Sequence, residues 1–247
     1  MTAVERRALA ARLLPLLDLT SLGEDDTPAR IEALCRSART PHGTPAAVCV
    51  YPEHATTVRR AVDGSGIRVA AVVNFPDGSA DGKRIARETR RAIAAGADEI
   101  DAVFPYHELR VRAPKRARRA VDACVDACGG VPLKLILETG ELGSDALVRQ
   151  ACRIGLDAGV AFLKTSTGKV AVGATPDAAR WMLDEIARDG ARCGFKASGG
   201  IRRLEDAATY VALAEARLGS AWLDAAHFRI GASALYTEIL AALGDAS

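Results

Sequence analysis

Short apolar segments recur along the chain at intervals of about 22 to 35 residues. Each is long enough for a buried strand and too short for a typical helix. We therefore predict six strands, at residues 46–51 (AAVCVY), 68–73 (RVAAVV), 98–104 (DEIDAVF), 133–138 (LKLILE), 161–166 (AFLKTS) and 194–198 (GFKAS).

Helical patterns separate these strands, for example at residues 80–97 and at 144–161, where Ser144 is the expected N-cap. Alternation of strand and helix predicts parallel βαβ units. Two weaker strand candidates, at 218–222 and 227–231, bring the total to eight. The expected fold is therefore an α/β protein of the (β/α)8 TIM-barrel class.

A doubly wound open sheet is the structural alternative, although no G-x-G-x-x-G motif follows the first strand. No linker interrupts the alternation. We therefore predict one domain over residues 1–247, with residues 3–39 forming additional N-terminal helices.

Composition narrows the classes of partner. The chain has 247 residues, 49% of them hydrophobic, and a net charge of +2, which suits one large core. The basic run at 110–119 contains no aromatic residue and is expected to be a solvated helix face, so no nucleic-acid partner is predicted. No segment reaches the eighteen apolar residues of a membrane span.

Cysteine usage and the N-terminus bear on location. The six cysteines form no C-x-x-C pair, and the first residues lack an apolar signal core. These features predict a reduced, cytoplasmic protein.

Charged residues lie within the predicted strands, where apolar residues would be expected. Because side chains alternate between the two faces of a strand, one face of each of several strands is charged. Helices cover the outside of such a barrel, so these charges are expected inside it, near the carboxyl ends of the strands. A structural ion network is the alternative, but desolvation makes it a poor source of stability. The set comprises Glu99, Asp101, Glu138, Lys134, Lys164 and Lys196.

The choice of lysine over arginine favours amine chemistry. The chain has only six lysines beside twenty-seven arginines, and three of the six fall in predicted strands. An arginine can form ion pairs but cannot become a free amine nucleophile. Lys196 on the next strand, about 5 Å away, would lower the pKa of Lys164 by about two units, burial would act in the same direction, and Asp101 would oppose both.

Glycine-containing turns follow the predicted strands. Backbone N–H groups at Gly199, Gly200 and Ser233, with Arg202 or Lys169 supplying positive charge, would suit a phosphate. The segment around Gly168 is not a P-loop, because the required first glycine and the final hydroxyl residue are absent.

The sequence contains neither a metal-ligand motif nor the motif of a serine nucleophile. The histidines at 42, 54, 107 and 227 show no i, i+2 or i, i+4 pairing, and the serines lack a G-x-S-x-G elbow. No metal site and no cofactor are predicted.

Eight segments closely resemble the deoxyribose-phosphate aldolases, and they run from about residue 14 to 235: LLDLTSL, AAVCVYP, NFPDG, GADEIDAVFPY, LILETGEL, FLKTSTGKVAVGAT, GFKASGGIR and RIGAS. The resemblance implies a (β/α)8 barrel. It also implies reversible cleavage of 2-deoxy-D-ribose 5-phosphate into D-glyceraldehyde 3-phosphate and acetaldehyde, without metal or organic cofactor. The expected partners are therefore a small phosphosugar and aldehydes.

The resemblance also implies roles for individual residues. Lys164 corresponds to the Schiff-base lysine, Lys196 to the second lysine and Asp101 to the acidic proton-relay residue. Substrate-hydroxyl contacts fall on Asp18 and Thr20, and Cys49 corresponds to a strand cysteine lining the site; from the residues alone, Asp18 would be a helix-end cap and Cys49 a small core residue. Phosphate contacts fall on Gly168, Lys169, Gly199, Gly200, Arg202 and Ser233.

Two departures from the family pattern bear on function. Ser233 is followed by Ala234 where some relatives have a second serine, and the chain ends in LGDAS where some relatives carry a terminal tyrosine. A different Schiff-base aldolase and a noncatalytic phosphosugar-binding barrel are the alternative functions. A homodimer is the expected assembly, because many soluble oligomers have twofold symmetry.

Overall fold

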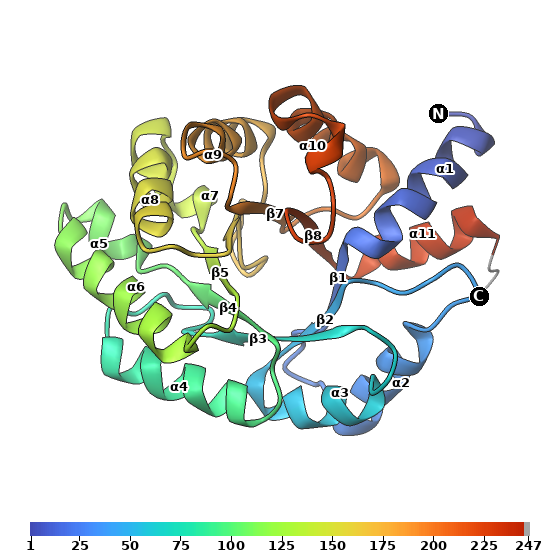
Figure 1. Ribbon diagram of the computed structural model, residues 1–247, viewed down its shortest axis with the longest axis horizontal. Helices are drawn as coiled ribbons and strands as arrows, with labels where there is room; N and C mark the ends of the chain where they lie inside the picture. Colours follow the sequence, from blue (N-terminus) through green and yellow to red (C-terminus); the bar gives the residue numbers. More distant parts are fainter. Residues whose placement is uncertain (245–247) are drawn as a thin grey trace.

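The strands of this computed structural model, which describes residues 1–244, close into a barrel in sequence order (Figure 1). Every neighbouring pair is parallel, and β8 pairs with β1. The predicted (β/α)8 fold is confirmed. The strands are β1 (Leu17–Thr20), β2 (Ala47–Val50), β3 (Arg68–Val73), β4 (Glu99–Val103), β5 (Leu133–Ile136), β6 (Phe162–Lys164), β7 (Gly194–Ser198) and β8 (Phe228–Ala232).

Helices form the outer layer around this barrel (Figure 1). Their starts follow the expected capping chemistry: the Ser144 hydroxyl accepts from the N–H of Leu147 at the start of α8. The helices are α1 (Ala3–Leu13), α2 (Pro28–Ser37), α3 (Ala55–Ala61), α4 (Gly82–Ala94), α5 (Tyr106–Arg110), α6 (Pro114–Cys128), α7 (Thr139–Leu142), α8 (Asp145–Asp157), α9 (Pro176–Arg188), α10 (Leu204–Leu218) and α11 (Ala234–Leu243), with short 3-10 turns η1 (Leu14–Leu16), η2 (Pro52–His54) and η3 (Ser220–Trp222).

Two sequence expectations are corrected. Residues 17–20 lie inside the segment 3–39 that was expected to be helical, yet they form β1. This strand has four residues and directly follows α1 and η1, so its apolar residues merge with the helical pattern before it. Residues 218–222 are not a strand: α10 ends at Leu218, Gly219 has a φ of +86°, and η3 follows.

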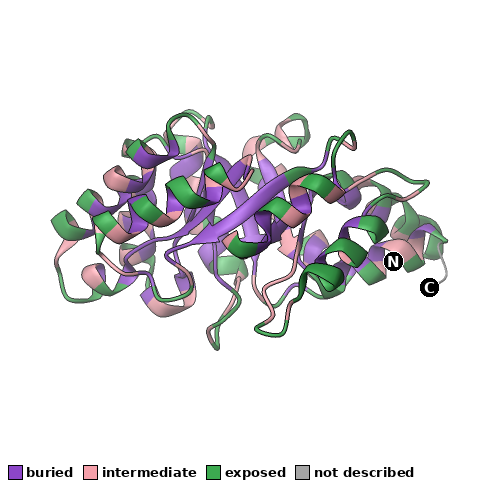
Figure 2. Cartoon of the chain, turned by 90° about the horizontal axis from the view of Figure 1, so that it is seen from below, coloured by how far each residue is buried: buried purple, intermediate pink, exposed green. Residues whose placement is uncertain are grey.

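The strands are largely buried, with the helices on one side and the barrel interior on the other (Figure 2). Their outward side chains, such as Val48 and Leu163, pack beneath the helices in the main hydrophobic core. Inside the barrel, β2 and β3 contribute a small apolar cluster that includes Cys49 and Val72. The remaining strands place charged residues inside, so the barrel interior has an apolar side and a charged side.

Expectations from the sequence also concern the cysteines, membrane spans and the chain end. All six cysteines are buried free thiols. No helix within residues 1–244 is long and apolar enough to cross a membrane. Most of the chain end that lacks a tyrosine, residues 245–247, lies outside the described residues.

Candidate active site

Two lysines on adjacent strands share one carboxylate oxygen. Lys164 on β6 and Lys196 on β7 occupy the same register position. The Nζ atom of Lys164 lies 2.8 Å from Oδ2 of Asp101, and that of Lys196 lies 2.7 Å from the same oxygen. The three residues that the sequence singled out as catalytic candidates are therefore in direct contact.

A third lysine lies beside them. The Nζ atom of Lys134 on β5 is 2.5 Å from Glu99 Oε2, 3.1 Å from Asp101 Oδ1 and 3.0 Å from Asp18 Oδ2. The Lys134 and Asp18 side chains have no exposed surface, and that of Glu99 is 3% exposed. Five of the six charged residues predicted for the interior thus belong to one network.

Two members of the network were not predicted from the strand pattern. Asp18 on β1 accepts from Lys196 at 2.5 Å and from Arg229 on β8 at 2.6 Å. The Arg229 guanidinium also donates to Glu99 at 3.0 Å and lies 5.6 Å from the centre of the Phe162 ring. The strand pattern did not show Asp18, which only the family resemblance assigned to the site, because β1 was expected to be helical. Arg229 was missed because β8 was only a weak candidate. An arginine within the short apolar segment 227–231 was the sequence feature that could have indicated a charged interior position.

The two neighbouring lysines have opposite pKa shifts. Burial lowers the pKa of Lys164, Asp101 opposes this, and the charge of Lys196 lowers it further. Burial also acts to lower the pKa of Lys196, but Asp101 and Asp18 outweigh it and raise that pKa. Lys196 and burial were both expected to lower the pKa of Lys164 against Asp101, and burial is the larger of the two causes.

The pKa values of Asp101 and Asp18 are lowered by the cations around them. Burial acts to raise the pKa of Asp101, but the charges of Lys134, Lys164 and Lys196 hold it well below its usual range. The pKa of Asp18 is lowered in the same way, against its burial, by Lys134, Lys196 and Arg229. These groups can accept hydrogen bonds without first losing a proton.

Glu138 lies apart from this network, contrary to the sequence expectation. β5 ends at Ile136, and Glu138 has a left-handed backbone with φ of +56°, so the strand alternation no longer sets its direction. Its carboxylate accepts from the Thr167 hydroxyl at 2.5 Å and from the Thr167 N–H at 3.2 Å. Burial raises the pKa of Glu138, and these hydrogen bonds oppose the shift. Glu138 therefore holds the loop that follows β6.

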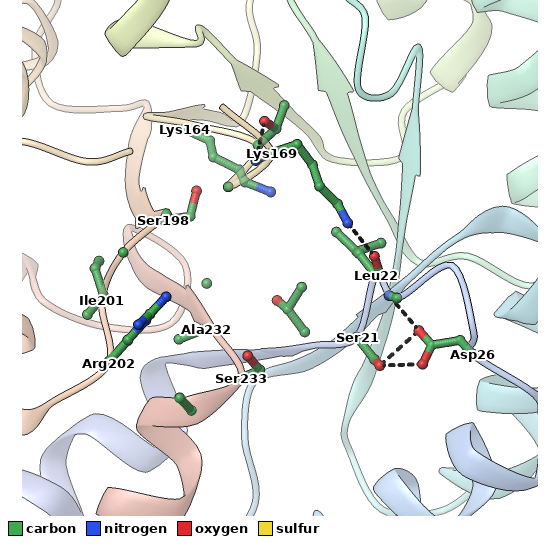
Figure 3. Close-up of a pocket in the computed structure, with 18 of the residues that line it drawn as sticks. Ser21, Leu22, Asp26, Lys164, Lys169, Ser198, Ile201, Arg202, Ala232 and Ser233 are labelled. Atoms are coloured by element: carbon green, nitrogen blue, oxygen red, sulfur yellow. Dashed lines mark hydrogen bonds between the residues drawn. The ribbon is translucent and has the colours of Figure 1, made fainter. Parts of the chain in front are cut away.

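A cavity of about 390 Å³ opens above the lysine pair, at the carboxyl ends of the strands. Lys164 lines it (Figure 3). Active sites of (β/α)8 enzymes lie at this end of the barrel. All of the predicted phosphate contacts line the same cavity: Gly168, Lys169, Gly199, Gly200, Arg202 and Ser233.

Three loops build the proposed phosphate end of the cavity. Gly199 has a φ of +90°, which favours glycine, and a side chain there would also crowd Gly173 and Ser166. Ser233 is the N-cap residue of α11, where the first N–H groups of the helix have no intrahelical acceptor. Figure 3 shows Arg202 and Ser233 on one side of the cavity and Lys164 and Lys169 on another.

The loop after β1 closes the cavity opposite Arg202 (Figure 3). The Asp26 carboxylate accepts from the Ser21 hydroxyl at 2.9 Å and from the Gly23 N–H at 3.0 Å, which holds this loop in shape. The Nζ atom of Lys169 reaches across to the carbonyl oxygen of Leu22 at 2.7 Å. Lys169 thus bridges the loops after β6 and β1.

The remaining predicted contacts lie at different depths. Thr20 lines the cavity, and its hydroxyl donates to the Asp18 carbonyl at 2.8 Å. Cys49 is buried inside the barrel, with Sγ 4.0 Å from Asp101 Oδ2, and burial is the main cause that raises the pKa of its thiol. The Asp18 carboxylate is enclosed by Lys134, Lys196 and Arg229.

Histidine, cysteine and acidic side chains do not gather into a group of three or more that could hold a metal ion anywhere in residues 1–244. The charged interior is instead occupied by contacts between carboxylates and cationic side chains.

Comparison with known proteins places this site in a family. A family model described as DeoC/LacD family aldolase matches residues 12–235. The chain belongs to the DeoC/LacD family of aldolases. The family resemblance noted from the sequence motifs is therefore confirmed, and the protein is a lyase of the aldolase type.

Solved structures of similar proteins agree with this family membership. A Toxoplasma gondii ME49 protein assigned as a deoxyribose-phosphate aldolase has a TM-score of 0.89 and 24% sequence identity. The match covers 98% of this chain and 96% of the Toxoplasma chain. The tetrameric deoxyribose phosphate aldolase of Aeropyrum pernix has a TM-score of 0.76 and 27% identity, covering 96% and 91%. An aldolase called QR15 has a TM-score of 0.79 and 25% identity, covering 93% and 96%.

Proposed function

We propose that this DeoC/LacD family member is a Schiff-base (class I) aldolase that reversibly cleaves 2-deoxy-D-ribose 5-phosphate into D-glyceraldehyde 3-phosphate and acetaldehyde, without a metal ion or organic cofactor. The observation that carries the proposal is the position of Lys164. Its amine lines the cavity, and its pKa is lowered by burial. A neutral amine facing a cavity is the group required to attack an aldehyde.

The first stage forms the covalent intermediate. The Lys164 amine adds to the C1 carbonyl of the open-chain sugar and gives a carbinolamine, which loses water to become an iminium ion. The departing oxygen must gain two protons. The attacking amine gives up one, which the Asp101 carboxylate accepts and passes on, and the Lys196 ammonium supplies the other and is reprotonated when the iminium is hydrolysed at the end of the cycle. Lys164 and Lys196 both lie within hydrogen-bond distance of the Asp101 carboxylate.

The second stage breaks the carbon–carbon bond. The C3 hydroxyl gives its proton to the Asp101–Lys196 pair, which returns it to the enamine carbon in the next step. C3 becomes the carbonyl carbon of glyceraldehyde 3-phosphate, and the electrons of the C2–C3 bond move into the iminium to form an enamine. Protonation of the enamine carbon and hydrolysis then release acetaldehyde and the free Lys164 amine. The positive nitrogen acts as the electron sink, which is the gain from covalent catalysis.

The other end of the cavity binds the phosphate. Arg202 supplies a fixed positive charge, while Gly199, Gly200 and the start of α11 at Ser233 supply backbone N–H groups. Lys169 from the loop after β6 adds a second cation. Holding the phosphate orients the sugar and keeps C1 beside Lys164. Ala234 leaves this site with one hydroxyl fewer than relatives that have two serines.

Thr20 and Asp18 are proposed to bind substrate hydroxyls by different routes. Thr20 lines the cavity and can contact the sugar directly. Asp18 is enclosed by cations, so it acts on the substrate through Lys196, to which it is bound at 2.5 Å. Cys49 completes the interior wall beside Asp101.

Product analysis tests this reaction. Purified protein should convert 2-deoxy-D-ribose 5-phosphate to equal amounts of acetaldehyde and glyceraldehyde 3-phosphate, and a chelator should leave the rate unchanged. A Schiff-base aldolase for a larger keto-sugar phosphate would release no acetaldehyde from any substrate. A noncatalytic phosphosugar-binding barrel would bind the sugar phosphate and release no product.

The assembly proposed for the protein is a twofold-symmetric homo-oligomer. The Aeropyrum pernix relative is tetrameric, and a dimer is the smallest assembly with twofold symmetry. Sedimentation velocity will determine the number of chains. A monomer at all concentrations would refute this part of the proposal.

A further inference from the structure

Arg229 lies inside the barrel but does not line the cavity. Its side chain is 4% exposed, and its guanidinium donates to Asp18 and Glu99. An arginine keeps its charge at every pH at which proteins are folded. It therefore contributes a fixed positive charge to the network without contacting the substrate.

The network contains one more base than acid. Its carboxylates are Asp18, Glu99 and Asp101, and its cationic groups are Lys134, Lys164, Lys196 and Arg229. The Arg68 side chain reaches Glu99 at 3.6 Å from outside, but it is 56% exposed and therefore screened by solvent. An uncompensated charge is costly in a buried site, so one of the bases is expected to be neutral.

The contacts determine which base gives up its proton. Lys134 is within 3.1 Å of carboxylates from three residues, and Lys196 is within 2.7 Å of carboxylates from two. Lys164 contacts a single carboxylate, that of Asp101, at 2.8 Å. Its ammonium form is therefore the least stabilised of the three.

We propose that Arg229 is a positioning residue that makes Lys164 the surplus base: by binding Asp18 and Glu99 it leaves the three lysines to share too little negative charge, and Lys164 becomes the free amine. This inference rests on the proposed Schiff-base function of Lys164. Without the charge of Arg229, three lysines would face three carboxylates, and Lys164 would keep its proton at neutral pH.

Other titratable groups surround Lys164, and the test must leave them unchanged. The pKa of Lys164 is influenced directly by Cys49 on β2, Asp101 on β4 and Lys196 on β7. The charge of Lys164 in turn lowers the pKa of Glu138, which follows β5. Lys134 on β5 acts on it through Asp101. None of these is altered in the variants below.

The test compares Arg229→Met with two variants of matched charge. Arg229→Lys keeps the positive charge. The double variant Arg229→Met with Glu99→Gln removes one cation and one carboxylate, so the network again has one surplus base. The pKa of Lys164 is measured from the pH dependence of its carbamoylation by cyanate, which reacts with neutral amines, with the modified peptide quantified by mass spectrometry. This measurement does not require aldolase activity.

Arg229→Met should raise the pKa of Lys164 by about one unit or more, the shift expected from a nearby buried charge. The acidic limb of kcat/KM should move to higher pH by the same amount. Arg229→Lys and the double variant should both keep a pKa close to that of the wild-type protein. If Arg229→Met does not fold, Glu99→Gln alone decides the question. It removes one carboxylate and leaves two surplus bases, so the pKa of Lys164 should fall, and an unchanged pKa would overturn the inference.

An unchanged Lys164 pKa in folded Arg229→Met would overturn the inference. So would a raised pKa in the double variant or in Arg229→Lys, because packing rather than charge would then be responsible. Failure of the proposed function has a different signature: the wild-type protein would release no acetaldehyde, while the cyanate measurement would still give the Lys164 pKa in every variant.

Discussion

Lys164 and Lys196 lie side by side at the same register position of β6 and β7, and both donate to Oδ2 of Asp101, at 2.8 and 2.7 Å. The pKa of Lys164 is lowered, mainly by burial, whereas that of Lys196 is raised against its burial by Asp101 and Asp18. The two lysines therefore differ in how readily they lose a proton, and Lys164 loses its proton more easily. This difference fits the proposed roles of Lys164 as the nucleophile and Lys196 as a proton donor.

Lys196→Leu should lose most turnover while remaining folded. The substitution removes the proton donor and the positive charge that helps to lower the pKa of Lys164. Because the amine is neutral only above its pKa, the rise of kcat/KM with pH should move to higher pH. A profile of unchanged shape, with a rate within about twofold of the wild-type rate, would show that this electrostatic role is wrong.

Asp101→Asn should separate proton transfer from amine activation. Asp101 raises the pKa of Lys164, so its loss leaves the amine neutral, but the shared acceptor of the two lysines is gone. We expect kcat to fall by at least about 100-fold, the contribution typical of general acid–base catalysis. Acetaldehyde and borohydride should still modify Lys164.

The matched control for Asp101 is Asp126→Asn, an exposed aspartate of α6. It should have wild-type kinetics. Wild-type turnover in Asp101→Asn would mean that another group carries the protons.

Strand positions could be predicted from the sequence, because buried parallel strands are continuous apolar runs bounded by polar residues. The predictions for 68–73 and 194–198 match β3 and β7. β1 was missed, since four residues after a helix and a 3-10 turn give no separate periodic signal. The family resemblance alone assigned Asp18 to the site.

Pairing between distant strands was the less predictable part of the site. Alternation along β5 placed Lys134 correctly, but it failed for Glu138, where the backbone turns left-handed. The contact of Arg229 with Asp18 joins residues 211 positions apart, and only closure of the barrel at β8 and β1 brings them together. No local sequence pattern indicates which residues of β8 and β1 become neighbours when the barrel closes.

Arg202→Ala should act mainly on phosphorylated substrate. The Arg202 side chain lines the cavity together with Gly199 and Ser233, at the end where the phosphate is proposed to bind. We expect kcat/KM for 2-deoxy-D-ribose 5-phosphate to fall by at least about tenfold, as for loss of a hydrogen bond to a charged group, while kcat/KM for free deoxyribose changes little. Arg203→Ala is the control, since Arg203 is exposed and does not line the cavity. Equal losses on both sugars would place Arg202 in folding or chemistry instead.

Glu138→Ala should loosen the loop after β6. The carboxylate binds both the hydroxyl and the N–H of Thr167, whose hydroxyl in turn accepts from the N–H of Lys169 at 3.0 Å. We expect KM for the phosphorylated sugar to rise more than kcat falls, and Glu138→Gln, which keeps one acceptor oxygen, to lie between Glu138→Ala and wild type. A fall in kcat at unchanged KM would indicate that Glu138 acts on the reacting atoms.

The central claim is that the amine of Lys164 forms the covalent bond, and trapping with acetaldehyde and borohydride tests it most directly. Reduction of the imine should leave one ethyl group on the peptide that contains Lys164. Lys164→Arg keeps a positive charge but has no usable amine, so it should neither trap acetaldehyde nor turn over substrate. Labelling at Lys196 or Lys134 in place of Lys164, or full activity in Lys164→Arg, would contradict the proposed mechanism.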